Sequence, residues 1–299
     1  MTVVPPAATD RAPAKKLGGP RSVVLRALLR NRLAVLALAV LALLLVAALF
    51  APYDPNTQDL LIRLRPPAWQ DGGTGAHLLG TDQLGRDMLS RVIHGARVSL
   101  LVGAGAALLA GVIGTAVGLA AGYFGGWADR TLMRLADVQL AFPSLLLALA
   151  VVGFLGSGLW LVVLVLGFTG WVSYARVVRS EVMSLRTRDF ITEARAIGVT
   201  DTTIMRRHLL PNVMAPLATI GTLHVAAAIV AEASLSYLGL GVPKETVTWG
   251  AMLADGQLYL GTSWWVAVFP GIALMLTSLA VNITGDALRD VADPKAYRR

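Results

Sequence analysis

Long apolar segments alternate with polar segments along the chain. A helix needs about 20 mostly apolar residues to cross the hydrocarbon layer of a bilayer, since each residue adds about 1.5 Å. The uncharged stretch from Val138 to Ala175 is too long for one span, and its glycine-rich residues 153–158 predict a break. The pattern therefore predicts an all-α membrane protein with six transmembrane helices, at residues 33–51, 98–122, 138–154, 158–178, 213–237 and 264–285.

The same pattern divides the chain into five regions. We expect a cytoplasmic tail at 1–32, a first transmembrane helix at 33–51, an extracytoplasmic loop at 52–97, a core domain of five transmembrane helices at 98–288, and a cytoplasmic tail at 289–299. The first apolar run has 19 residues, which exceeds the usual length of a signal peptide core. We therefore interpret it as a membrane anchor.

Composition and charge agree with a lipid environment and indicate the orientation. Of 299 residues, 56% are hydrophobic and only 15% are charged, against about 25% charged in soluble domains. Twenty of the 26 lysines and arginines fall in the two tails and in the loops after spans two and four. The positive-inside rule then places both termini in the cytoplasm and explains the net charge of +8 without nucleic acid.

The predicted extracytoplasmic loop, residues 52–97, is rich in proline, glycine and aspartate. Residues 79–87 are rich in turn-forming residues, and residues 87–97 have helical spacing that leads into span two. Two interpretations stay open. The segment is either a solvated loop with a membrane-surface helix, or a docking surface or lid at the mouth of a pathway.

The cytoplasmic segment 179–212 predicts a helical hairpin. Residues 181–196 have amphipathic spacing, and Gly198 suits the left-handed conformation that ends a helix. Thr200 or Asp201 can cap a second short helix that ends before Pro211. Small residues on the first helix, including Ala194, would let another protein approach closely. The alternative is a basic loop that touches only lipid headgroups.

This segment resembles a known family. Nine residues separate Gly198 from the sequence at 208–211. This segment resembles the EAA loop in membrane subunits of bacterial ABC importers, which has the same spacing from glycine to Leu-Pro. The opening of that loop aligns with 192–197, where Thr192 replaces its glutamate and Glu193 its first alanine. Further segments resemble the C-type permease subunit of dipeptide and oligopeptide importers: 51–55, 80–87, 121–126, 141–143 and 238–242.

The resemblance implies a division of labour in the bacterial plasma (inner) membrane. In that family a second homologous permease subunit completes the pathway. Two ATP-binding subunits, or one fused ATPase, lie beneath it, and an extracytoplasmic substrate-binding protein delivers the substrate. The EAA loop is the coupling helix, between spans four and five. The residues implied in ATPase coupling are Glu193, Ala194, Gly198, Leu210 and Pro211.

The substrate implied by the resemblance is a di- or oligopeptide, with a nickel chelate or glutathione as alternatives. The chain contains no phosphate-binding Gly-Lys pair, so ATP and magnesium would be held by the partner subunits. It also lacks cysteine and the common hydrolase and metalloprotease motifs, so we expect no catalytic residue and no metal site.

Several residues within the spans are candidates for packing or transport. Gly114, Gly118 and Gly122 form a ridge that Gly126 would extend, packing either within the chain or at a subunit interface. Pro143 and Pro270 would interrupt spans three and six as static or mobile kinks.

Glu232 is the one acid far along span five. With Ser236 and Tyr237 it either lines a pathway or gate, or makes a structural hydrogen bond. A transporter driven by an ion gradient is the rival class. Such a protein usually shows inverted repeats and intramembrane ion pairs, for which Glu232 is the single candidate here.

Overall fold

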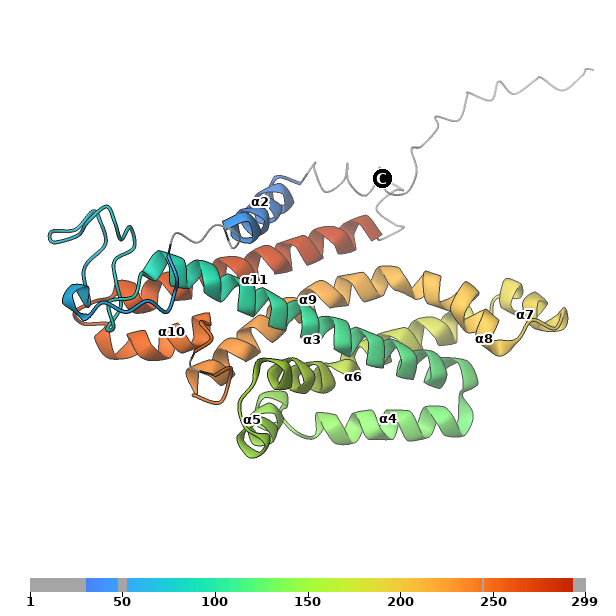
Figure 1. Ribbon diagram of the computed structural model, residues 1–299. Helices are drawn as coiled ribbons and strands as arrows, with labels where there is room; N and C mark the ends of the chain where they lie inside the picture. Colours follow the sequence, from blue (N-terminus) through green and yellow to red (C-terminus); the bar gives the residue numbers. More distant parts are fainter. Residues whose placement is uncertain (1–30, 48–52, 244, 293–299) are drawn as a thin grey trace, which may run out of the picture.

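The computed structural model describes residues 31–47, 53–243 and 245–292, in which the regular elements are helices and no β-strand occurs (Figure 1). An isolated antiparallel bridge joins Thr81 and Asp87. The long helices are α2 (Arg32–Ala47), α3 (Met88–Phe124), α4 (Gly126–Leu140), α5 (Ser144–Leu155), α6 (Leu159–Leu185), α9 (Leu210–Tyr237) and α11 (Trp265–Ala292). The shorter ones are η1 (Leu60–Ile62), α7 (Asp189–Ala196), α8 (Asp201–Thr203), the π-helical η2 (Ile204–Leu209), α10 (Trp249–Gly256) and η3 (Gln257–Tyr259).

Four of the six predicted spans are recovered as single helices long and apolar enough to cross a membrane. They are α3, α6, the continuous helix Asp201–Tyr237, and Trp265–Asp290 within α11. The pair α4 and α5 gives a fifth span if it is counted as one. Helix α2 is apolar but has 16 residues, and the rest of the predicted first span lies outside the described residues.

The third span differs from the prediction. A single helix over 138–154 is wrong, because the chain breaks between α4 and α5 and the two axes differ by 82°. Pro143 causes the break, since its ring disfavours helical conformation in the preceding residue and it has no N–H to donate. Pro270 lies inside α11 without ending it.

The glycine ridge of α3 packs within the chain. A Cβ atom added at Gly114, Gly118 or Gly122 would come within 2.4 to 2.8 Å of atoms of α6. This geometry matches the intramolecular alternative, because only glycine permits such a close approach of the two helices. Gly126 does not extend the ridge, since it lies beyond the end of α3 and no atom lies within 4 Å of its Cβ position.

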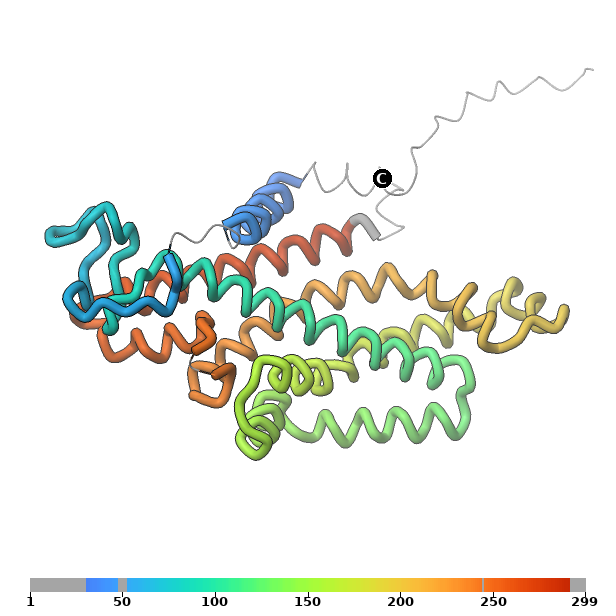
Figure 2. The backbone as a smooth tube through the Cα atoms, viewed as in Figure 1, coloured from blue at the N-terminus to red at the C-terminus, as the bar shows by residue number. Residues whose placement is uncertain are grey.

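The bundle is elongated, with different structures at its two ends. Residues 53–87 and α10 lie at one end, and α7 and α8 lie at the other (Figures 1 and 2). Helix α3 has 37 residues and therefore extends for about 55 Å between these ends. Helix α2 packs against α11 along one side of the bundle.

Candidate functional site

A helical hairpin forms the end of the bundle where α7 lies, but its first arm is shorter than predicted. The expected helix over 181–196 is wrong: α6 continues through Leu185, and α7 begins only at Asp189. The extended backbone of Arg188, at φ −79° and ψ 150°, separates the two helices. Glu181 thus belongs to α6 and not to the hairpin.

Gly198 ends α7 as predicted, at φ +81°. The Val199 N–H donates to the Ala194 carbonyl at 3.0 Å, and the Gly198 N–H donates to the Arg195 carbonyl at 3.0 Å. These two bonds define a Schellman motif, which requires a residue in the left-handed conformation. No neighbouring atom lies within 4 Å of a Cβ placed at Gly198, so its requirement is a backbone conformation and not space.

The second arm also differs from the prediction. A separate helix that ends before Pro211 is wrong, because α8, η2 and α9 form one continuous helix from Asp201 to Tyr237. The π-helical η2 widens this helix just before Pro211, and the Leu210 N–H donates to the Met205 carbonyl five residues back. The Asn212 side chain donates to the His208 carbonyl at 2.6 Å. The chain thereby passes Pro211 without ending the helix.

The five residues implied in ATPase coupling do not share one surface. Glu193, Gly198 and Pro211 are exposed, and Leu210 is half-buried. Ala194 is only 7% exposed and packs in an apolar cluster of its own chain with residues of α6 and α9. The expectation that Ala194 faces a partner protein is therefore corrected, and its part in coupling stays a prediction.

Two exposed apolar residues on the hairpin were not singled out from the sequence. Ile197 is 80% exposed, and the ring of Phe190 is partly exposed on the same short helical segment. Exposed charges of both signs, including Glu193 and several arginines, surround these two apolar side chains. The sequence pattern did not indicate their exposure, because an apolar residue in an amphipathic helix is normally assigned to its buried face.

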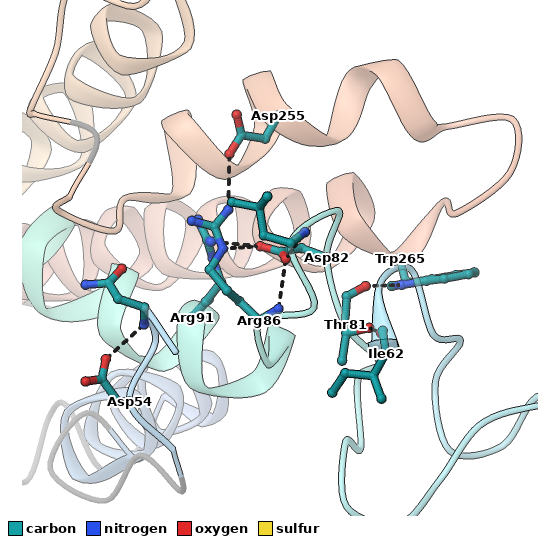
Figure 3. A network of polar contacts seen from close by, with 10 residues as sticks. Asp54, Ile62, Thr81, Asp82, Arg86, Arg91, Asp255 and Trp265 are labelled. Carbon is teal, nitrogen blue, oxygen red and sulfur yellow. Dashed lines mark hydrogen bonds and ion pairs between the residues drawn. The ribbon is translucent and has the colours of Figure 1, made fainter. Parts of the chain in front are cut away.

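The opposite end of the bundle holds a buried ionic network around Asp82 (Figure 3). Asp82 is 2% exposed, and its Oδ2 atom accepts from Arg86 Nε at 2.7 Å and from Arg91 Nη1 at 2.8 Å. Its Oδ1 atom accepts from the backbone N–H groups of Leu84 and Arg86. Trp265 of α11 donates from Nε1 to the Thr81 carbonyl at 3.0 Å, which attaches this loop to the bundle.

This network changes the interpretation of the predicted loop 52–97. Residues 88–97 are the first turns of α3 and not a separate surface helix, with Asp87 as the N-cap that accepts from the Ser90 N–H at 2.8 Å. Asp82, Arg86 and Arg91 are buried, so the loop is an ordered structure rather than a freely solvated one.

A cavity of about 650 Å³ adjoins the network, and both Ser236 and Tyr237 line it. Arg86 and Asp255 meet at its wall with 3.8 Å between their charged atoms. Within the described part of the chain, Gln83 Oε1 and Arg91 Nε make no hydrogen bond. Tyr237 and Asp255 are exposed and line this cavity, where their polar atoms can bind a polar solute.

Glu232 does not line this cavity. It is 0% exposed, and its carboxyl group accepts from Ser236 Oγ at 2.7 Å and from Ser99 Oγ at 3.2 Å. The latter bond connects α9 to α3, as the structural alternative predicted. A role of Glu232 as a gate stays a prediction, as does the role of Tyr237, whose hydroxyl donates to Gln257.

The described residues contain no group of three or more His, Asp or Glu side chains placed to hold a metal ion. A bundle of apolar helices, with a helical hairpin at one end and a polar cavity at the other, defines the class as a multi-pass membrane protein. The chain belongs to the family of binding-protein-dependent transport system inner membrane components, whose family model matches residues 114–298. Residues 19–67 match the N-terminal TM domain of oligopeptide transport permease C.

Relatives cover most of the chain. The Di/tripeptide transport system permease protein DppC of Pseudomonas aeruginosa is 44% identical over 89% of this chain and 89% of its own length. The Glutathione transport system permease protein GsiD of Pectobacterium atrosepticum is 41% identical over 90% and 89%.

A solved structure shares the fold. A chain of the MetNI methionine ABC transporter in inward-facing conformations matches with a TM-score of 0.55 and 21% identity. The match covers 68% of this chain and 97% of that one.

Proposed function

We propose that this chain is the permease subunit of an ABC importer for di- or oligopeptides and supplies half of the translocation pathway. The relatives support the substrate class, because proteins named for di/tripeptide and dipeptide transport are 44% and 39% identical to it over 89% of the chain. Glutathione is the second candidate substrate, since relatives named for glutathione transport are 41% and 42% identical.

The proposed topology has six spans in the bacterial plasma (inner) membrane, with both termini in the cytoplasm. The five regions are those expected from the sequence, with boundaries at 32, 51, 97 and 288. The distribution of lysine and arginine supports this orientation. The hairpin of α7 and α8 then lies on the cytoplasmic side, and the Asp82 network and its cavity lie on the extracytoplasmic side.

In this proposal the hairpin is the contact for an ATP-binding partner, and α7 is the coupling helix. The observation that carries it is the exposed helix α7, closed by a Schellman turn at Gly198, at the end of the bundle opposite the Asp82 network. ATP and magnesium bind to two ATP-binding subunits or to one fused ATPase. A second homologous permease and an extracytoplasmic substrate-binding protein complete the assembly.

Uptake by reconstituted vesicles tests the function. The chain is reconstituted with its second permease and ATPase, ATP is enclosed, and binding protein with a labelled dipeptide is added outside. We expect uptake that requires both ATP and binding protein. Uptake by this chain alone, driven by an ion gradient, would contradict the proposal. Uptake of labelled glutathione that requires ATP and binding protein, with no uptake of the labelled dipeptide, would select the second candidate.

A further inference from the structure

Tyr123 lies in the last turn of α3 and contacts both arms of the hairpin. Its hydroxyl donates to Asp201 Oδ1 of α8 at 2.5 Å and accepts from Arg195 Nε of α7 at 3.3 Å. The guanidinium carbon of Arg195 also lies 4.8 Å from the centre of the Tyr123 ring, a cation–π distance. Tyr123 is 5% exposed, and its ring packs in the same apolar cluster as Ile191 and Ala194 of α7.

A second contact joins the end of α3 to the start of the hairpin. Arg186, directly after α6, donates from Nη1 to the Gly122 carbonyl at 3.1 Å. A polar cavity of about 510 Å³ lies beside these groups, lined by Tyr123, Phe124, Arg186, Thr187, Arg195 and Asp201. The open space on this side means that specific polar contacts, and not continuous packing alone, hold α3 to the hairpin.

Chain connectivity makes these contacts important. The hairpin is covalently continuous with α6 through residues 186–188 and with α9 through η2, but α3 is joined only to the loop before it and to α4. A displacement of the hairpin therefore reaches α6 and α9 directly, whereas α3 follows it only through noncovalent contacts. Tyr123 is the α3 side chain that bonds to both arms.

The opposite end of α3 carries Arg91, which is buried against Asp82 and lines the extracytoplasmic cavity. A single helix of about 55 Å therefore connects the hairpin to that cavity. We propose that Tyr123 is a positioning residue for coupling, which makes α3 follow the hairpin and so passes its displacement to the cavity wall. The inference rests on the proposed function, in which an ATPase moves the hairpin.

The test uses the complete reconstituted importer with Tyr123→Phe, which keeps the ring and removes the hydroxyl. Tyr174→Phe is the matched control, because the Tyr174 hydroxyl is buried in the same cluster and makes no hydrogen bond within the described part of the chain. The measurements are dipeptide uptake per ATP hydrolysed and the stimulation of ATPase activity by loaded binding protein. We expect Tyr123→Phe to lower the uptake ratio about fivefold or more, with Tyr174→Phe unchanged.

A second pair of variants separates coupling from folding. Asp201 is exposed, so Asp201→Ala removes the acceptor without opening the core, and Asp201→Asn keeps an oxygen that can accept. We expect Asp201→Ala to reproduce the loss and Asp201→Asn to restore most of the ratio. If the importer with Tyr123→Phe does not assemble, the comparison of Asp201→Ala with Asp201→Asn decides whether coupling needs this hydrogen bond.

The outcomes distinguish this inference from the function on which it rests. Normal uptake ratios in both Tyr123→Phe and Asp201→Ala, with a coupled wild-type importer, overturn the role of Tyr123 alone. A wild-type assembly without ATP-dependent uptake contradicts the proposed function itself.

Discussion

Asp82 neutralises two buried cations, so the end of the bundle that holds residues 53–87 depends on one side chain. Arg86 and Arg91 both donate to its Oδ2 atom, and their side chains are 10% and 5% exposed. Removing one partner of a buried ion pair is strongly destabilising, because the remaining charge has lost both water and its counterion. The ion pair between Arg86 and Asp255 is longer, at 3.8 Å, and the Asp255 side chain is 47% exposed.

We predict that Asp82→Ala lowers the free energy of unfolding by about 3–5 kcal/mol. Asp255→Ala is the control, with a change of at most about 1 kcal/mol, because exposed ion pairs are worth little. Thermal unfolding of the purified protein in detergent measures both. Equal melting temperatures for the two variants would show that Asp82 does not hold the network together.

The charges of Asp82, Arg86 and Arg91 are visible in the sequence, but their pairing is not. The turn-rich pattern at 79–87 left a solvated loop and a docking surface both open, and Asp82 and Arg86 pair within a turn, where the helical i,i+4 rule gives no signal. Tyr123 was missed for a different reason. Its two partners lie 72 and 78 residues away, and their approach depends on how the hairpin folds back on α3.

The end of α7 at Gly198 was predicted correctly, because the left-handed conformation that ends this helix is a local property of glycine. The helix end expected before Pro211 was wrong, because the helix continues through this proline. Helix α4 was missed because its charged residues, Asp129, Arg130 and Arg134, break the apolar run that identified the other spans. Two of the charges on α4 are satisfied by α6, where Arg179 pairs with Asp129 and Arg176 with Asp137. Single-sequence patterns do not contain such pairings.

We predict that Gly198→Val uncouples ATP hydrolysis from uptake or prevents assembly with the ATPase. A β-branched residue in the left-handed region costs about 1–2 kcal/mol, which favours another path for the turn. Gly198→Asn is the matched control, since asparagine tolerates this conformation. Stimulated ATPase activity and uptake in vesicles measure the effect. Normal coupling in the valine variant would refute a role for the turn.

The distribution of arginine and lysine predicts which end of the molecule faces the cytoplasm. The bundle has two structurally different ends, as this orientation requires. Asp71 and Glu193 are both exposed and lie in the segments at opposite ends of the bundle. The four unbroken apolar helices were predictable from length alone, whereas the 82° break at Pro143 was expected only as a kink. Apolar length does not indicate whether a proline bends a helix or ends it.

We predict that a cysteine introduced by Asp71→Cys reacts with a membrane-impermeant thiol reagent in intact cells. Glu193→Cys should react only after the inner membrane is opened, because α7 lies on the cytoplasmic side in the proposed topology. The chain has no native cysteine, so each signal is specific. The reverse labelling pattern would overturn the topology.

The wide π-helical turn of η2 sets the rotational phase between α8 and α9. If Ile204–Leu209 relaxed to α-helical geometry with no residue removed, α8 would rotate by about 100° around its axis, because the π-helical segment accommodates about one more residue than an α-helix of the same total turn. Asp201 would then turn away from Tyr123 while every apolar residue of α9 kept its place. The wide turn of this short segment therefore fixes the direction in which α8 faces, independently of the hydrophobicity that holds α9 in the bilayer.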